Sequence, residues 1–251
     1  MDRASLIGII FGISAVIGGN FAEGGRIGSI LQPTAALIVF GGTLGATLLS
    51  FSSGDIIRAF IALKDVLIER KADPDSFIDE IVRYAELARK NGLIILEKEI
   101  PRIDDPYFRR VMMLAVDRMA SKTLRETIEQ ENITYEEERR RVSKVFDTAG
   151  GIAPTIGILG AILGLIQVME NLSEPSKLGA GIAVAFVATV YGVGSANLLL
   201  IPAAKKLMNR LNQELALREM ILEGVVGIQS GMNPHYLRER LRAFLEGSGK
   251  R

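Results

Sequence analysis

Four stretches of this chain carry no charged side chain, and they form two pairs on either side of a long, heavily charged middle. They are residues 4–22, 27–54, 148–169 and 178–204. A helix that crosses a bilayer needs about 20 mostly apolar residues, so each stretch has, or nearly has, spanning length. A soluble core of 251 residues does not need four such segments. The pattern therefore predicts a polytopic helical membrane protein with one large insertion.

The segment bounds follow from where the charges begin. We expect an all-α membrane protein with four transmembrane helices and a helical cytoplasmic domain inserted between spans 2 and 3. The predicted segments are spans at 4–22, 30–52, 148–170 and 178–204, the inserted domain at 53–147 and a cytoplasmic helical tail at 205–251.

Basic residues set the expected orientation. The link between the first two spans holds Arg26 as its only basic residue, and the link between the last two holds Lys177. The other 28 of the 30 Lys and Arg residues lie at the amino terminus, in the middle segment or in the tail. Because positive charge is retained in the cytoplasm, both termini and the inserted domain are expected there.

The inserted domain reads as helices. Asp73-Pro74 and Asp105-Pro106 are helix starts, in which a capping residue precedes proline in the first turn. Asn91-Gly92 is a stop signal, and a further helix begins near Ser121 and continues into span 3. After span 4 a helix follows from Lys205, and Asn233-Pro234 starts a last short one.

Several kinds of chemistry have no residues to support them. The chain has no cysteine, and its single histidine, His235, lies in a polar tail. No nucleotide-binding glycine loop, metal-ligand spacing or Ser/His/Asp set is present. We therefore expect a protein that is not an enzyme and binds no cofactor or metal. None of the four spans contains a carboxylate, although intramembrane acids mark ion pathways. If the protein moves ions, their binding group must come from another chain.

Small residues mark the faces on which membrane helices approach one another. Spans 1 and 2 each hold one GxxxG, at Gly8/Gly12 and Gly41/Gly45, for which we expect packing inside the chain. Spans 3 and 4 are richer in glycine and alanine than a four-helix protomer needs. For them we expect packing against further subunits or a foreign helix.

Three further residues stand out within the spans. Thr189 lies in the middle of span 4, where a lone threonine usually bonds to a carbonyl one turn earlier. Pro154 and Pro202 lie near the cytoplasmic ends of spans 3 and 4. Because proline removes a backbone donor, each marks either a passive kink or a hinge.

The ordered set of segments resembles the MotA/PomA subunit of the bacterial flagellar stator over essentially the whole chain. Residues 149–165 are similar to the family's third-span signature, and residues 183–192, running on to Asn197 and Pro202, are similar to its fourth. Further matches lie at the amino end from Leu6 and at 41–43, 87–92 and 224–234.

The resemblance implies a ring, understood as a pentamer, around a dimer of a MotB/PomB-type partner in the bacterial inner membrane. That partner's single span supplies the ion-binding aspartate, which Thr189 faces across the pore. Pro154 and Pro202 match prolines that couple ion passage to movement of the cytoplasmic domain. Arg89 and Glu97 match positions that engage the rotor protein FliG, with Lys90, Lys98 and Glu99 nearby; a solvated helix surface is their plainer interpretation.

Two positions depart from patterns in the family. Sodium-driven members place a second threonine in span 3 where this chain has Ala161. The missing oxygen removes a possible ligand for a hard cation, so we favour protons as the coupling ion, with sodium possible. Several relatives carry an acid at the position of Lys98, which leaves the sign of the rotor contact open there.

Two alternatives remain at this point. An ExbB/TolQ-type energiser of envelope processes is a related ion-driven ring, but it has three spans. A permease or membrane enzyme that acts alone would need its own intramembrane polar site, and Thr189 offers little.

Overall fold

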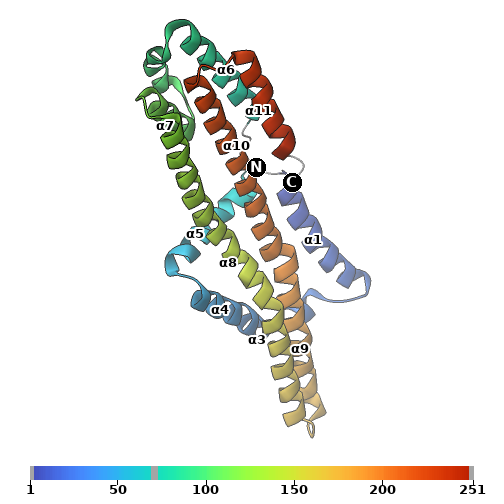
Figure 1. The fold of residues 1–251 in the computed structure, drawn as a ribbon. Helices are drawn as coiled ribbons and strands as arrows, with labels where there is room; N and C mark the ends of the chain where they lie inside the picture. The colour runs from blue at the N-terminus through green and yellow to red at the C-terminus, as the bar shows by residue number, and fades with distance from the viewer. Residues whose placement is uncertain (1–2, 69–72, 249–251) are drawn as a thin grey trace. The chain divides into compact units, whose positions relative to one another are not determined.

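The computed structural model describes residues 3–68 and 73–248, so residues 69–72 of the predicted inserted domain and 249–251 of the predicted tail lie outside the described residues. Within these ranges the chain is helical and contains no strand. It divides into two compact units (Figure 1). The membrane unit comprises the described residues up to Ile68 together with Arg140–Met208, and the helical unit comprises the described residues of 70–139 and 209–251.

Four helices are long and apolar enough to cross a membrane, as predicted. The candidate spans are Ala4–Ala22 in α1 (Arg3–Ala22), the segment Pro33–Ser50, α8 (Ser121–Glu170), and the long segment Pro175–Gln229. That last segment comprises α9 (Pro175–Ser195), a π-helical turn η4 (Ala196–Leu200) and α10 (Ile201–Gln229). The expected passage of one helix from the inserted domain into span 3 is confirmed by α8, which is 50 residues long.

Span 2 is less regular than its sequence predicts. A single turn, α2 (Ile27–Ile30), is followed by extended backbone at Leu31 and Gln32. The span then restarts with Pro33 in its first turn and runs through α3 (Pro33–Ala36), the π-helical η1 (Leu37–Gly41) and α4 (Gly42–Ser50). Proline suits a helix start because its missing N–H would have no partner there. Pro33, the seventh of the 28 residues in the uncharged run 27–54, therefore begins a helix.

The membrane unit has two small clusters of buried apolar residues. Ala35 and Val39 of span 2 pack against Val184, Val187 and Ala188 of α9. The second cluster joins α5 (Ser53–Leu67) to α8 and α10, and its members are Ala59, Ala62, Val142, Val145, Phe146 and Ala204. Elsewhere the spans present large apolar side chains outward, as a lipid solvent allows; Leu49 is 91% exposed.

The helical unit contains α6 (Pro74–Asn91), the short 3₁₀ turns η2 (Leu93–Lys98) and η3 (Ile100–Arg102), α7 (Pro106–Val116), the first part of α8, the end of α10, and α11 (Pro234–Ser248). The predicted starts are confirmed: side-chain oxygens of Asp73, Asp105 and Asn233 accept backbone N–H groups of the first turns. Gly92, at φ 80°, ends α6 as predicted.

A continuous core of large side chains fills this unit. Tyr84 and Phe108 are fully buried and meet edge to face with ring centroids 6.0 Å apart. They are surrounded by apolar residues of α6, α7, α8, α10 and α11. The unit therefore has the packing of an ordinary soluble domain.

Candidate functional site: the seam of spans 3 and 4 and an exposed charged segment

Spans 3 and 4 lie against each other with almost no side chain between them. A Cβ built on Gly157 would lie 2.8 Å from the carbonyl oxygen of Ala188, and one built on Gly192 would lie 2.6 Å from the carbonyl oxygen of Ala153. Such distances are closer than real Cβ contacts, so only glycine fits. The same seam includes Gly164 and Gly181.

The packing of individual glycines differs in part from what the sequence predicts. The glycines Gly157, Gly164 and Gly192 pack inside the chain rather than against another subunit, because the short hairpin after Glu170 makes α8 and α9 antiparallel neighbours. For the first two spans the expected packing inside the chain is found only in part: a Cβ built on Gly12 would lie 3.3 Å from Leu198 Cδ2, whereas no heavy atom comes within 4 Å of one built on Gly8 or Gly45.

Thr189 and Ala161 flank the seam on α9 and α8. Both are partly exposed. Thr189 lies beside Gly157, whose built Cβ would be 3.5 Å from the Thr189 Cα, and Ala161 follows Gly157 by one helical turn. The two residues proposed for the ion pathway therefore lie along the same seam, and their role there stays a prediction.

The hydroxyl of Thr189 donates to the carbonyl oxygen of Ala185, at 3.2 Å. This is the bond to the preceding turn that a lone intramembrane threonine is expected to make. Because its one proton is engaged, the hydroxyl offers only acceptor lone pairs to any further group. It can accept a hydrogen bond from an acid or a hydrated proton, or contribute one oxygen to a cation.

Tyr191 connects this part of span 4 to the irregular start of span 2. Its hydroxyl donates to the carbonyl oxygen of Ile30 at 2.6 Å and accepts the N–H of Gln32 at 3.3 Å. Its ring stacks on Phe40 with centroids 5.6 Å apart. Backbone groups that leave a helix inside a membrane need partners, and one side chain supplies both. The sequence assigns no role to Tyr191; Pro33 in an apolar run is the signal that a break needed a partner.

Both proposed hinge prolines lie in continuous helix. Pro154 is inside α8, and Pro202 follows η4 as the second residue of α10. The wider π turn avoids part of the clash between a proline ring and the carbonyl of the preceding turn. The arrangement accommodates Pro202 without breaking the helix, and a hinge role for either proline stays a prediction.

The proposed rotor-contact residues occupy one segment of the helical unit, at the end of α6 and in η2. Arg89, Lys90, Glu97 and Lys98 are exposed, and no ion pair joins them to another residue in the part of the chain that the structure describes. Glu99 differs because it pairs with Arg102 at 2.8 Å. Four charges are thus available for contact with another molecule.

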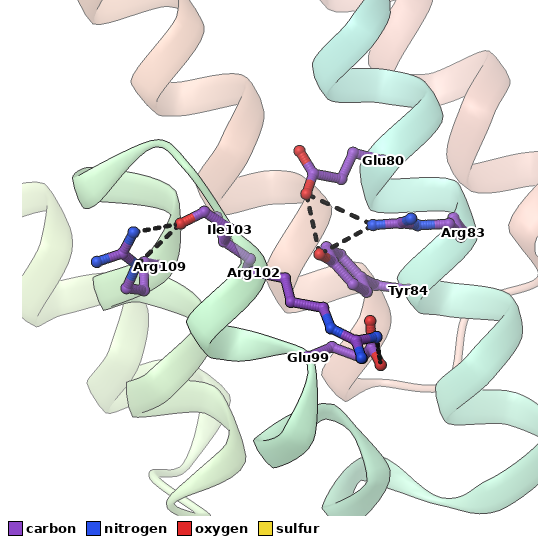
Figure 2. A network of polar contacts seen from close by, with 7 residues as sticks. All are labelled: Glu80, Arg83, Tyr84, Glu99, Arg102, Ile103 and Arg109. Atoms are coloured by element: carbon purple, nitrogen blue, oxygen red, sulfur yellow. Dashed lines mark hydrogen bonds and ion pairs between the residues drawn. The ribbon is translucent and has the colours of Figure 1, made fainter.

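The rest of the segment is anchored (Figure 2). The Arg109 guanidinium donates twice to the carbonyl oxygen of Ile103, at 2.9 and 2.6 Å. Leu96 and Ile103 are buried in the core. These contacts hold the backbone that carries Glu97 and Lys98, so the exposed charges rest on a fixed support.

Tyr84 supports the same region from α6. Figure 2 shows its hydroxyl donating to Glu80, at 2.9 Å, while it accepts from Arg83, at 3.0 Å. Burial, together with the neighbouring Glu80 carboxylate, raises the pKa of Tyr84 to about 12. The phenol therefore stays protonated and remains a donor at physiological pH.

The described residues contain no group of His, Cys, Asp or Glu side chains that could hold a metal ion. The uncharged stretches of the four candidate spans, residues 4–22, 27–54, 148–169 and 178–204, contain no Asp or Glu. The polar chemistry of the seam rests on hydroxyl and backbone oxygens.

Comparisons with known proteins agree with this architecture. Residues 99–220 match the MotA/TolQ/ExbB proton channel family, and residues 6–92 match the Motility protein A N-terminal family. Motility protein A of Bacillus subtilis is 32% identical over 98% of this chain and 91% of its own length. Chemotaxis protein PomA of Vibrio alginolyticus is 32% identical over 100% of this chain and 98% of its own. A structure of C. jejuni MotAB superposes with a TM-score of 0.92 at 28% identity, covering 97% of this chain and 96% of the other.

The fold and these matches define a multi-pass membrane protein of the MotA/TolQ/ExbB proton channel class. Because residues 6–92, which include the first two spans, match the Motility protein A N-terminal family, the comparisons favour this family over the three-span ExbB/TolQ alternative. The chain belongs to the MotA/PomA family.

Proposed function

We propose that the chain is the ring-forming subunit of a flagellar motor stator. With a MotB/PomB-type partner, it couples ion flow across the bacterial inner membrane to torque on the rotor. The observation that carries this proposal is the seam of spans 3 and 4, where the Thr189 hydroxyl lies partly exposed in a segment without acids. Five copies around two partner spans, with both termini in the cytoplasm, is the assembly implied by the family resemblance.

The missing acid is supplied by the partner. A membrane-embedded ion pathway normally contains an ionisable group, and the seam offers only oxygens. An aspartate on the partner's span, when protonated, donates to the free lone pairs of Thr189; when ionised, it finds no donor there, because the hydroxyl proton is already bound by Ala185. Loading and release of the ion therefore change the fit between partner and ring, and the ring steps.

Protons are the favoured coupling ion. A dehydrated sodium ion needs several oxygen ligands, and Ala161 contributes none at the position one turn from Gly157. A proton needs only the partner acid. One charge that crosses 100 mV releases about 2.3 kcal/mol, which is enough to drive small repeated steps.

Torque leaves the subunit through the charged segment of the helical unit. Arg89 and Glu97 meet complementary charges on the rotor protein FliG, with Lys90, Lys98 and Glu99 beside them. The support for this role is that four of these side chains are exposed and have no ion-pair partner among the described residues.

The ion pathway is tested by swimming speed and proton conduction of the complex with Thr189→Ser and Thr189→Val. Serine keeps the acceptor oxygen, and we expect it to retain most of the activity. Valine keeps the shape and removes the oxygen, and we expect at least a tenfold loss of conduction, about 1.4 kcal/mol. Equal activity of the two variants, or conduction by this chain reconstituted without a partner, contradicts the proposal.

The torque path is tested separately with Arg89→Glu and Glu97→Lys. Both variants should assemble and conduct normally but lose torque, and exchanging the sign of a facing rotor charge should restore it. Normal swimming by both variants removes these residues from the torque path and leaves the ion pathway unaffected.

A further inference from the structure

Helix α5 is apolar on two opposite faces. Ile56, Ala59 and Ala62 are at most 7% exposed and pack into the membrane unit. Ile57, Phe60 and Ile61 point away and are 60–61% exposed. A helix bathed in water would carry polar residues on this second face. Because α5 begins at Ser53, three residues after span 2 ends at Ser50, its outer face starts at the edge of the bilayer.

Cations surround this part of the membrane unit. The described residues of 53–68, 140–147 and 201–208 contain seven Lys or Arg and three Asp. Four of the cations are exposed and make no ion pair with any described residue; we call them the cation belt: Arg58, Lys64, Lys144 and Lys205. By contrast, Lys177, at the opposite ends of spans 3 and 4, pairs with Glu174 at 2.8 Å.

Packing contacts place the belt residues together. Ser143 and Ala204, which immediately precede Lys144 and Lys205, are joined by a hydrogen bond of 2.8 Å. On α5, Ala59 next to Arg58 and Ala62 two residues before Lys64 pack into the cluster that contains Ala204 and Val145. Three helices therefore carry their unpaired cations within ten residues of the ends of the uncharged stretches.

Lys64 also shares the outer face of α5 with the exposed apolar residues. It follows Phe60 by four positions and Ile61 by three, and residues at these spacings lie on one side of a helix. A lysine among exposed apolar side chains reaches past them with its charged end while its methylene stem stays with them. This combination suits a surface in which an apolar layer lies directly beneath a layer of negative charge.

We propose that the cation belt and the outer face of α5 bind anionic phospholipids. The phosphate headgroups accept hydrogen bonds from the four cations, and Ile57, Phe60 and Ile61 lie among the upper acyl chains. Unpaired cations next to an apolar segment are the combination that recognises anionic lipid at the cytoplasmic surface. The inference does not depend on the stator function, since it requires only that the spans cross a membrane.

The test is native mass spectrometry of the purified full-length chain, titrated with phosphatidylglycerol or phosphatidylcholine. The variants are Arg58→Gln/Lys64→Gln and Lys144→Gln/Lys205→Gln. The control is Lys122→Gln/Arg242→Gln, which removes the same charge from exposed positions of the helical unit. A cation near an anionic surface contributes about a fivefold change in binding, so each belt variant should lose at least tenfold in phosphatidylglycerol binding. The control and all phosphatidylcholine binding should not change.

Retention of phosphatidylglycerol by both belt variants within a factor of two overturns the proposal, as does equal binding of the two lipids by the unmodified chain. A changed oligomer size with unchanged lipid binding also overturns it, because the belt would then face an acidic protein surface. If the variants fail to fold, the unmodified chain still tests the proposal. Its preference for phosphatidylglycerol over phosphatidylcholine must fall as the salt concentration is raised, since salt screens exposed charges.

Discussion

In the membrane unit, Gly157 and Gly192 bring two helix backbones into direct contact, whereas in the helical unit Gly224 and Gly227 lie against the side-chain ends of Ile81 and Leu237. The difference follows from the solvent. Apolar side chains gain no hydrophobic stabilisation by moving from lipid into a helix interface, so the spans associate through close backbone approach. Water drives large side chains inward, so glycine in the helical unit only makes room for them.

The largest expected effect tests the role of side-chain size in the helical unit. Phe108→Ala removes a fully buried ring and should cost about 3–5 kcal/mol. Leu49→Ala removes an apolar side chain from the membrane unit that is 91% exposed, and should change stability by less than about 0.5 kcal/mol. Thermal unfolding in detergent measures both. Equal losses would remove the distinction between the two units.

The next effect tests backbone contact in the membrane unit. Gly192→Ala would place a methyl group 2.6 Å from the Ala153 carbonyl oxygen, so the spans must separate, at a cost of about 1–3 kcal/mol. Gly194→Ala is the matched control on the same helix, because no heavy atom lies within 4 Å of its built Cβ. Alanine is the better helix former, so the control should be neutral or stabilising. A lower melting temperature for Gly192→Ala, without a decrease for Gly194→Ala, confirms the seam, and an equal decrease for both contradicts it.

A smaller effect concerns the ion pairs that join helices within the helical unit. Glu223 accepts from Arg125 at 2.5 Å and from Arg240 at 2.8 Å. Burial opposes ionisation of Glu223, but the two arginines outweigh it and hold its pKa below the usual range. The folded state therefore gains stability from ionised Glu223 above the ordinary pKa of a glutamate, and loses it as pH falls through the lowered value.

We expect Glu223→Gln to cost about 1–2 kcal/mol near neutral pH. The difference from the unmodified protein should shrink in acid, as the glutamate itself becomes protonated. Denaturant unfolding as a function of pH measures this difference. Glu239→Gln, at an exposed position of α11, is the control and should leave the profile unchanged. A constant gap between Glu223→Gln and the unmodified protein down to low pH argues against the ionic role.

The smallest effect concerns the tie between spans 2 and 4. Tyr191→Phe keeps the stacking on Phe40 and leaves the Ile30 carbonyl and the Gln32 N–H unpaired. Hydrogen bonds between membrane helices are worth about 0.6 kcal/mol on average, so the melting temperature should fall only slightly. Hydrogen exchange at Gln32 should rise at least severalfold. Tyr236→Phe, at an exposed tyrosine of α11, should change neither.

Much of the fold follows from local signals. Uncharged length predicts the spans, and the Asp-Pro and Asn-Pro pairs predict the starts of α6, α7 and α11, because capping depends on residues adjacent in sequence. The break at Leu31 and Gln32 was not predicted, since its partner Tyr191 lies about 160 positions later in the chain. Which helix packs against each glycine could not be predicted either, because a small residue does not specify the helix that approaches it.

The candidate site shows the same division. Thr189 stands out as a polar residue in an apolar run, and its bond to Ala185 is local. Its position beside Gly157, one turn from Ala161, depends on the register between α8 and α9. The periodicity of apolar residues in a sequence does not predict that register. The exposure of Arg89 and Glu97 depends on the anchoring of η2 and η3 by Arg109 and the core.

The seam between α8 and α9 also limits how the subunit can deform. Main-chain atoms in contact have no rotamers to change, so the two helices move as one stiff body under load. Span 2 is held to that body by the Tyr191 phenol near Ile30 and by Ala35 and Val39, which pack against α9. Span 1, whose apolar window has no buried residue, is the part of the protomer that can yield.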